Sequence, residues 1–226
     1  HNEEADQTED IYTPTVSIFS KLKVSIRSRM TNDLQNRDGF TSNKYDGDKL
    51  KSYNKFLFKF DKSYQAGFLI EKDPGEVSFT DFASFHIQVN KIGFLKNFIA
   101  GDYILEFGQG LALWSPFGFS KSADAVFPVK KKASNLRPYS SAAEFRFFRG
   151  AAASITFEDL TVTGFYSNRT IDASVDSMTN EITSMGQTGF HRFESELNKK
   201  NTVSEKIAGG VLDYKFLGKM NFGVAY

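Results

Sequence analysis

The sequence contains no cysteine among its 226 residues, and this absence removes two classes of structure. Neither a disulfide framework nor a metal site built on thiolates can form. Proline is scarce, with five residues, and no stretch approaches the roughly 18 to 20 continuous apolar residues of a transmembrane helix. The first ten residues, HNEEADQTED, are acidic and lack an apolar core, unlike a signal peptide.

Neither sign of charge dominates the chain. Lysine and arginine number 28 against 27 aspartates and glutamates, a net charge of +1, which argues against a dedicated nucleic-acid-binding protein. Aromatic residues are abundant, with 24 phenylalanines and 9 tyrosines, yet the mean hydropathy is −0.36. Because the first residue is histidine, we expect the chain to be a piece of a longer precursor.

Hydrophobic residues recur with a period of two far more often than with helical spacing, which predicts an all-β chain of about nine or ten strands. Many of the predicted strands are nine to eleven residues long, and short turns such as the one at 61–63 alternate with long polar segments such as 168–204. The alternating stretches lie at 22–30, 55–60, 66–70, 83–89, 101–107, 144–147, 155–157, 160–166, 205–215 and 219–226.

Two antiparallel architectures produce this alternation. A soluble sandwich or barrel turns its apolar face inward, whereas an outer-membrane barrel turns it toward lipid and its polar face toward the lumen. Strand length, long segments alternating with short turns, and aromatics near strand ends favour an antiparallel up-and-down outer-membrane β-barrel. The aromatics expected at the membrane interface are Tyr103, Trp114, Tyr166 and Tyr226.

The segment GDYILEFGQGLALW, at 101–114, illustrates the membrane interpretation. Tyr103, Leu105 and Phe107 are expected to face lipid, while Asp102 and Glu106 point into a polar lumen, where charge is tolerated. The polar residues expected to face the lumen are Lys55, Lys59, His86, Asp102, Glu106, Glu144 and Arg146. Their mixed signs favour a salt-bridged, partly filled interior rather than a strongly ion-selective pore.

Several stretches of this chain resemble a Bacteroidetes-type family of helix-hairpin-helix (ComEA-like) domain-containing proteins. The matching segments are EKDPGE (71–76), GDYILEFGQGLALWSPFGFSKSADA (101–125), LRPYSSAAEFRFFRGAAA (136–153) and TSMGQTGFHRFESEL (183–197). The resemblance implies an outer-membrane barrel following a helix-hairpin-helix region, with outer-membrane lipid and the barrel-assembly machinery as partners. It implies no molecular activity, and no paired helices precede residue 16.

The predicted domain organisation follows from this resemblance. We expect an acidic disordered linker at 1–15 and a transmembrane barrel domain at 16–226 that forms the N-terminal part of a larger barrel. We therefore expect at least one unpaired sheet edge, since the first and last predicted strands show no sign of pairing with each other. The segment 115–140 holds three of the five prolines, which predicts a long loop packed over or into the barrel mouth.

No pattern in the sequence specifies an enzyme, a metal site or a cofactor site. His86 and His191 lack ligands or catalytic partners at defined spacing, so His86 is expected to be a lumen-facing hydrogen-bonding residue and His191 a polar loop residue. The carboxylates of EKDPGE could hold calcium, but their spacing defines no site. The basic run VKKKASNLRP, at 129–138, could contact lipopolysaccharide phosphates, although a solvated loop is the simpler interpretation.

Three functions remain compatible with the sequence. The chain could belong to a barrel that acts as a channel or as a transport or secretion component. It could instead be a non-transporting membrane anchor that organises a periplasmic region binding DNA or protein, or a soluble all-β module that binds glycans. The membrane interpretations place the chain in the bacterial outer membrane, with no direct nucleic-acid contact in this segment.

Overall fold

The structure is a computed structural model, and it describes residues 18–108, 110, 112–113, 133–218 and 220–226. The predicted linker at 1–15, Trp114 and the stretch 115–132 lie outside the described residues. The chain is all-β, with 58% of its residues in mostly antiparallel strands and 5% in helices. Within the described ranges, no helix is long and apolar enough to cross a membrane.

The long strands follow the alternating stretches of the sequence. The strands are β1 (Leu22–Asn32), β2 (Leu50–Phe60), β3 (Tyr64–Lys72), β4 (Phe82–Ile92), β5 (Leu95–Glu106), β6 (Asn135–Pro138), β7 (Phe148–Phe157), β8 (Leu160–Ile171), β9 (Ala173–Val175), β10 (Ile182–Met185), β11 (Val203–Phe216) and β12 (Met220–Ala225). The helical turns are η1 (Ile18–Lys21), α1 (Asp38–Thr41) and α2 (Glu194–Leu197).

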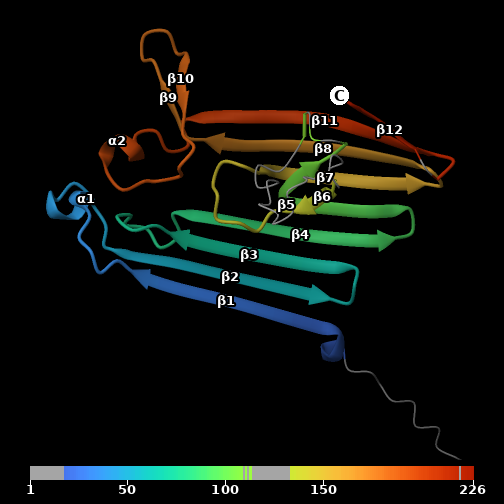
Figure 1. Cartoon of the computed structure of the whole chain (residues 1–226), viewed down its shortest axis with the longest axis horizontal. Coiled ribbons are helices and arrows are strands. Elements are labelled where there is room, and N and C mark those ends of the chain that lie inside the picture. Colours follow the sequence, from blue (N-terminus) through green and yellow to red (C-terminus); the bar gives the residue numbers. More distant parts are fainter. Residues whose placement is uncertain (1–17, 109, 111, 114–132, 219) are drawn as a thin grey trace, which may run out of the picture.

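The strands assemble into one large antiparallel sheet. Its order is β1-β2-β3-β4-β5-β7-β8-β11-β12, with β6 paired to β5, while β9 and β10 form a separate two-stranded sheet (Figure 1). Among the described strands, β1 pairs only with β2, and β12 pairs only with β11. The described residues therefore form no closed barrel, and the expectation of unpaired sheet edges is confirmed for them.

The connections differ sharply between the two ends of the sheet. At one end, the turn end, residues 61–63, 93–94, 158–159 and 217–219 join neighbouring strands. At the other, the loop end, the connections are 33–49, 73–81, 172–202 and the described part of 107–147, and they carry α1, α2, β6, β9 and β10 (Figure 1). This alternation of short and long connections was predicted from the sequence.

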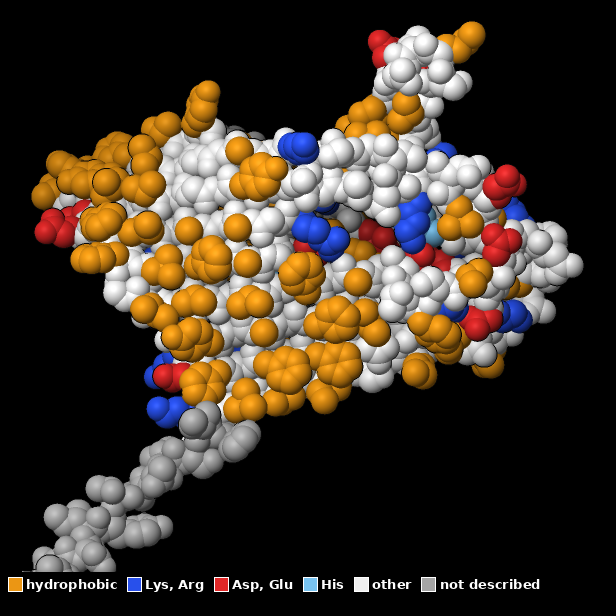
Figure 2. All heavy atoms as spheres, turned by 180° about the vertical axis from the view of Figure 1, so that it is seen from behind, with side chains coloured by type: hydrophobic (Ala, Val, Ile, Leu, Met, Phe, Trp, Pro, Cys, Tyr) orange, Lys and Arg blue, Asp and Glu red, His pale blue; other side chains and the backbone are white. Residues whose placement is uncertain are grey.

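The sheet has an apolar face, called here the outer face. On β4, Phe85 and Ile87 are 51% and 55% exposed, whereas their neighbours Ser84 and His86 are each 2% exposed. The pairing register continues this face across every long strand, because residues directly opposite in an antiparallel pair share a face. Figure 2 shows apolar side chains spread over most of it.

The opposite, inner face is mostly polar, with buried apolar residues at Leu69, Ile99, Ala152 and Val211, and it is partly covered by the chain itself. The end of β5 separates from β4 after Gly101 and from β7 after Tyr103, and it continues paired with β6. Residues 139–147 follow over the inner face. Lys55 donates from Nζ to the carbonyl oxygen of Ser140 at 2.9 Å, and Asn97 donates from Nδ2 to that of Leu136 at 2.7 Å. We call 102–107 together with 133–147 the inner segment.

The position of the inner segment corrects the predicted orientation of 101–107. His86 pairs with Gly101, so the odd-numbered residues of β5 share the inner face with His86. Tyr103, Leu105 and Phe107 are only 0%, 1% and 8% exposed, and they pack in a cluster with Ile99 and Leu136. The expectation that they face outward, with Tyr103 at a membrane interface, is therefore wrong.

A second correction concerns the stretch 144–147, which the alternation predicts to be a strand. Strand β7 begins only at Phe148, because Phe147 turns inward and stacks on Tyr139 at 4.9 Å between ring centroids. Within the predicted loop 115–140, residues Asn135–Pro138 form β6 instead, pairing with the end of β5. Here tertiary packing overrides the local pattern.

Candidate functional site: a charged cavity in a gap of the sheet

The departure of β5 leaves a gap in the sheet near the loop end. Pairing of β4 with β5 begins at His86, and pairing of β8 with β7 begins at Ser167. Phe82–Phe85 of β4 and the stretch 168–171 of β8 therefore flank an opening three strand spacings wide, about 14 Å between strand axes. We call this opening the lateral gap.

An ion pair fills the turn-end corner of the lateral gap. The Asp102 carboxylate, fully buried, accepts from Arg149 Nε at 2.6 Å, from Arg149 Nη2 at 2.9 Å and from the Phe85 N–H at 3.3 Å. Arg149 Nη2 also donates to the carbonyl oxygen of Ala83 at 2.8 Å. The pair thus hydrogen-bonds the Phe85 N–H and the Ala83 carbonyl, at the edge of β4 where pairing with β5 has ended. Without these partners, the buried backbone groups would destabilise the fold.

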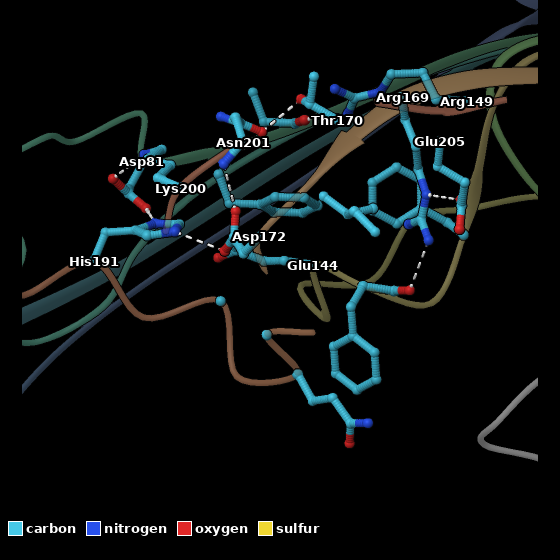
Figure 3. A pocket seen from close by; sticks show the side chains of 18 of the residues that line it. Asp81, Glu144, Arg149, Arg169, Thr170, Asp172, His191, Lys200, Asn201 and Glu205 are labelled. Atoms are coloured by element: carbon cyan, nitrogen blue, oxygen red, sulfur yellow. Dashed lines mark hydrogen bonds and ion pairs between the residues drawn. The ribbon is translucent and has the colours of Figure 1, made fainter. Parts of the chain in front are cut away.

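His191 is the centre of a second cluster, at the loop end of the lateral gap. Its ring nitrogens contact two carboxylates, Nδ1 with Asp81 at 2.5 Å and Nε2 with Asp172 at 2.8 Å (Figure 3). Lys200 Nζ donates to the other oxygen of Asp81 at 2.6 Å. The His191 N–H donates to Glu76 at 3.0 Å. The imidazole therefore links the connection 73–81 to the connection 172–202 at the loop end.

The charges in this cluster set the protonation of His191. Burial alone would lower its pKa, but the hydrogen bonds to Asp172 and Asp81 outweigh burial and raise the pKa to about 9. Burial likewise opposes ionisation of Asp81 and Asp172, yet contact with His191 leaves the pKa of each carboxyl below its usual value. At neutral pH the cluster is an imidazolium held between two carboxylates.

Two further carboxyl groups face this cluster and titrate differently. Burial raises the pKa of Glu144 to about 9; the positive charge of His191 opposes this, while the negative charge of Asp81 adds to it. Burial also raises the pKa of Glu76 to about 7, although backbone N–H groups of Asp73 and His191 favour its ionised form. Glu144 is therefore a neutral acid near pH 7, able to donate a hydrogen bond.

A cavity of about 340 Å³ within the lateral gap is lined by Arg149 of the ion pair and by Asp81, Asp172, His191 and Lys200 of the second cluster. Its wall combines the ion pairs with aromatic rings, and Phe147 lies 5.2 Å from the guanidinium carbons of both Arg149 and Arg169. Arg169 Nε donates to Glu205 at 2.7 Å (Figure 3). Seen from the outer side, Figure 2 shows a hollow with acidic side chains at depth and basic side chains beside it.

Glu76, Asp81 and His191 lie close enough to be considered as metal ligands, with one candidate ligand atom from each within 4.8 Å of the others. Both ring nitrogens of His191, however, already contact carboxylates. An imidazole ligates a metal through a neutral nitrogen, whereas the pKa of His191 is raised to about 9. The arrangement is that of a closed ion-pair network.

The structure brings only some of the predicted lumen residues together. Lys55 and His86 lie on the inner face, and His86 Nδ1 donates to the Tyr139 carbonyl while Nε2 accepts from Gln65, both at 3.0 Å. Gly67 makes room for this ring, because a Cβ there would lie 2.2 Å from it. Lys59 is exposed and shares the inner face with Gln65 opposite.

The other predicted lumen residues are scattered. Glu106 is buried in the inner segment and accepts from Arg137 Nη2 at 2.8 Å. Glu144 lines the cavity, whereas the Arg146 guanidinium lies 4.6 Å from the Phe145 ring. The expectation that Asp102 projects into a lumen is corrected, since its carboxylate lies in the lateral gap. Of the described interface candidates, Tyr166 is 49% exposed on the outer face and Tyr226 is fully exposed.

Sequence patterns could not reveal the network around His191. Its ring contacts Asp81, 110 residues earlier, and Asp172, 19 residues earlier, and the fold alone brings them together. The ion pair between Arg149 and Asp102 was unpredictable for the same reason, because the two residues are 47 positions apart in the sequence. Comparison of the chain with protein-family models, curated proteins and solved structures finds no match in any of the three. The resemblance to a barrel family stays a prediction.

Titration of His191 makes loop-end stability depend on pH. Its folded pKa, raised to about 9, exceeds the unfolded value of 6.5, so its contribution is fully present below pH 6.5 and is lost as pH rises through 9. The shift corresponds to about 3 kcal/mol. We expect His191→Gln to lower the free energy of unfolding markedly at pH 6 and little at pH 10, measured by urea titration. An equal loss at both values would contradict this assignment.

Proposed function

We propose that the chain forms part of the wall of an outer-membrane β-barrel that acts as a gated channel or as a transport or secretion component. The observation that supports this proposal is the inverted distribution of polarity in the sheet. Side chains such as Phe85, Ile87 and Phe222 are more than half exposed on the outer face. Ser84, His86 and Gln88 are buried on the inner face.

Energetics favour lipid as the medium of the outer face. Transfer of one large apolar side chain from water to an apolar medium stabilises by about 1.5 to 3 kcal/mol. A continuous patch of such side chains is rare on the surface of a monomeric soluble protein. The large apolar residues more than 40% exposed on the long strands are Val24, Ile26, Met30, Phe58, Tyr64, Phe68, Phe85, Ile87, Ile92, Phe157, Tyr166, Leu212, Tyr214, Phe216, Met220, Phe222 and Val224.

The dimensions of the strands agree with this proposal. Strands β2 and β4 have 11 residues and β8 has 12, at or just above the 9 to 11 residues needed by a strand tilted across a bilayer. Short turns at one end and long connections at the other match the usual periplasmic and external sides of such barrels. The loop end would then face outward from the cell.

The position of the inner segment favours a gated function rather than an open pore. It packs on the inner face through buried side chains such as Tyr139 and Leu136, and His191 links the connections at the loop end. Transport along the inner face would require the inner segment or these connections to move. The alternatives are a non-transporting anchor and a soluble glycan-binding module, and both remain compatible with the inner-face contacts.

Refolding into vesicles and recording conductance tests this proposal. We expect the complete barrel that contains this chain to acquire β-structure and protease resistance in phosphatidylcholine vesicles, and to pass little current in planar bilayers. Disrupting the link at His191 with His191→Gln should increase current at neutral pH. Vesicle insertion with no current from either form would favour the anchor. Folding in buffer without detergent or lipid would favour the soluble module and contradict membrane residence.

A further inference from the structure

The cavity in the lateral gap has an unusual position for a polar site. Phe82–Phe85 on one side and 168–171 on the other are the edges of strands within the sheet, so the cavity lies in the wall itself. Ala83, on the exposed side of β4, contributes to its lining. Figure 2 shows the corresponding hollow from the outer side, bordered by the apolar outer face. A ligand could therefore reach it laterally, along that face.

The chemistry of the lining is amphipathic. Phe82, Phe145, Phe147 and Met185 supply apolar surface, and the guanidinium groups of two arginines supply positive charge. The side chain of Arg149 is 37% exposed and lies two residues before Ala151 of the outer face. An exposed cation beside an extended apolar surface matches a molecule with an anionic head and a hydrocarbon tail.

The arginines have donor capacity beyond their ion pairs. A guanidinium carries five N–H donors. Arg149 makes two bonds to Asp102 and one to Ala83, and Arg169 makes one bond to Glu205 and one to the Phe145 carbonyl, within the described residues. Planar guanidinium groups bind carboxylate and phosphate oxygens through paired donors. The neutral acid of Glu144, which also lines the cavity, offers another donor.

We propose that the lateral gap is a binding site for a membrane amphiphile with an anionic head group, either a carboxylate or a phosphate. The head group contacts Arg149 and Arg169 inside the gap, and the hydrocarbon tail lies along the apolar outer face. The cavity volume of about 340 Å³ is at the small end of ligand pockets, which fits a head group with the tail left outside. This proposal rests on the proposed membrane location of the chain.

The experiment measures binding of palmitate to the full chain in dodecyl maltoside by native mass spectrometry. Methyl palmitate tests the need for the anionic head, and acetate and inorganic phosphate test the need for the tail. Ala83→Trp places a bulky ring at the cavity, while Ala208→Trp adds the same ring to the exposed outer face at a residue outside the cavity lining. Arg149→Lys keeps the charge but removes the planar fork.

We expect saturable binding of one palmitate, weakened about tenfold or more by Ala83→Trp and by Arg149→Lys, and changed less than about twofold by Ala208→Trp. Methyl palmitate should bind at least tenfold more weakly than palmitate. Equal binding of the ester, displacement of palmitate by acetate or phosphate at similar concentrations, or insensitivity to Ala83→Trp would each overturn the proposal. Vesicle insertion of the same variants is scored separately, so failure of membrane residence is distinguishable from failure to bind.

Discussion

Replacing Arg149 with methionine should destabilise the folded chain by about 3 to 5 kcal/mol, because it leaves the buried Asp102 carboxylate without its cation. The Asp102 carboxylate is fully buried and would lose two of its three hydrogen bonds. The carbonyl oxygen of Ala83 would lose the guanidinium donor as well. The measurement is urea-induced unfolding from vesicles, followed by circular dichroism at constant pH.

A double substitution separates the loss of charge pairing from simple loss of packing. Asp102→Leu combined with Arg149→Met replaces the pair with apolar side chains, and this should restore most of the lost stability. Apolar replacements of buried ion pairs are often neutral or stabilising. A double variant as unstable as Arg149→Met alone would show that the backbone contacts to β4, rather than an unpaired carboxylate, determine the effect.

Arginine at Ile26 should also have a large effect, provided that the outer face contacts lipid. Ile26 is 65% exposed near the centre of β1, and arginine near the bilayer midplane costs about 2 to 4 kcal/mol on a lipid-facing position. In water, the same change at an exposed residue would cost less than about 0.5 kcal/mol. The free energy of unfolding from vesicles, compared with the unsubstituted chain, measures the difference.

The neighbouring Ser25 provides a matched control. It is exposed on the same strand but belongs to the inner face, opposite Leu57, so Ser25→Arg should change stability by less than about 0.5 kcal/mol. Both variants carry the same added charge on adjacent residues. Equal effects at the two positions would mean that the faces of β1 have similar surroundings, which contradicts the proposed orientation.

Much of the sheet could be predicted because period-two alternation is a local property. The strand from Val203 to Phe216 and its return through β12 follow directly from alternating apolar residues. The turn at 61–63 and the long connection after β8 were also foreseeable. Each depends only on neighbouring residues, which is the information a single sequence provides.

The course of β5 could not be predicted, because leaving the sheet changes no local pattern. Residues Tyr103 to Phe107 alternate like any outer-face strand, yet the register set by His86 and Gly101 turns their odd-numbered side chains inward. A shift of one residue reverses the two faces of a strand, so sidedness depends on pairing partners that the sequence does not identify. For the same reason, the Asp102–Arg149 ion pair could not be predicted from the sequence.

The candidate site was the least predictable part of the chain. Of the residues around the cavity, only Glu144 was expected to face the lumen, and His191 was expected to be an ordinary loop residue. The partners of His191 come from the connection before β4 and from the residue that directly follows β8. Contacts over such separations arise from tertiary structure, and one sequence without spaced motifs contains no signal for them.

Nitroxide scanning along β4 tests the central claim, the lipid exposure of the outer face, most directly. The absence of native cysteine allows single cysteines at 83 to 89 to be labelled one at a time in vesicles. We predict that labels at Ala83, Phe85, Ile87 and Val89 are accessible to oxygen and shielded from a water-soluble nickel chelate, alternating with labels at Ser84, His86 and Gln88 that are poorly accessible to oxygen. Ready access of the nickel chelate to Phe85 and Ile87 would contradict the claim.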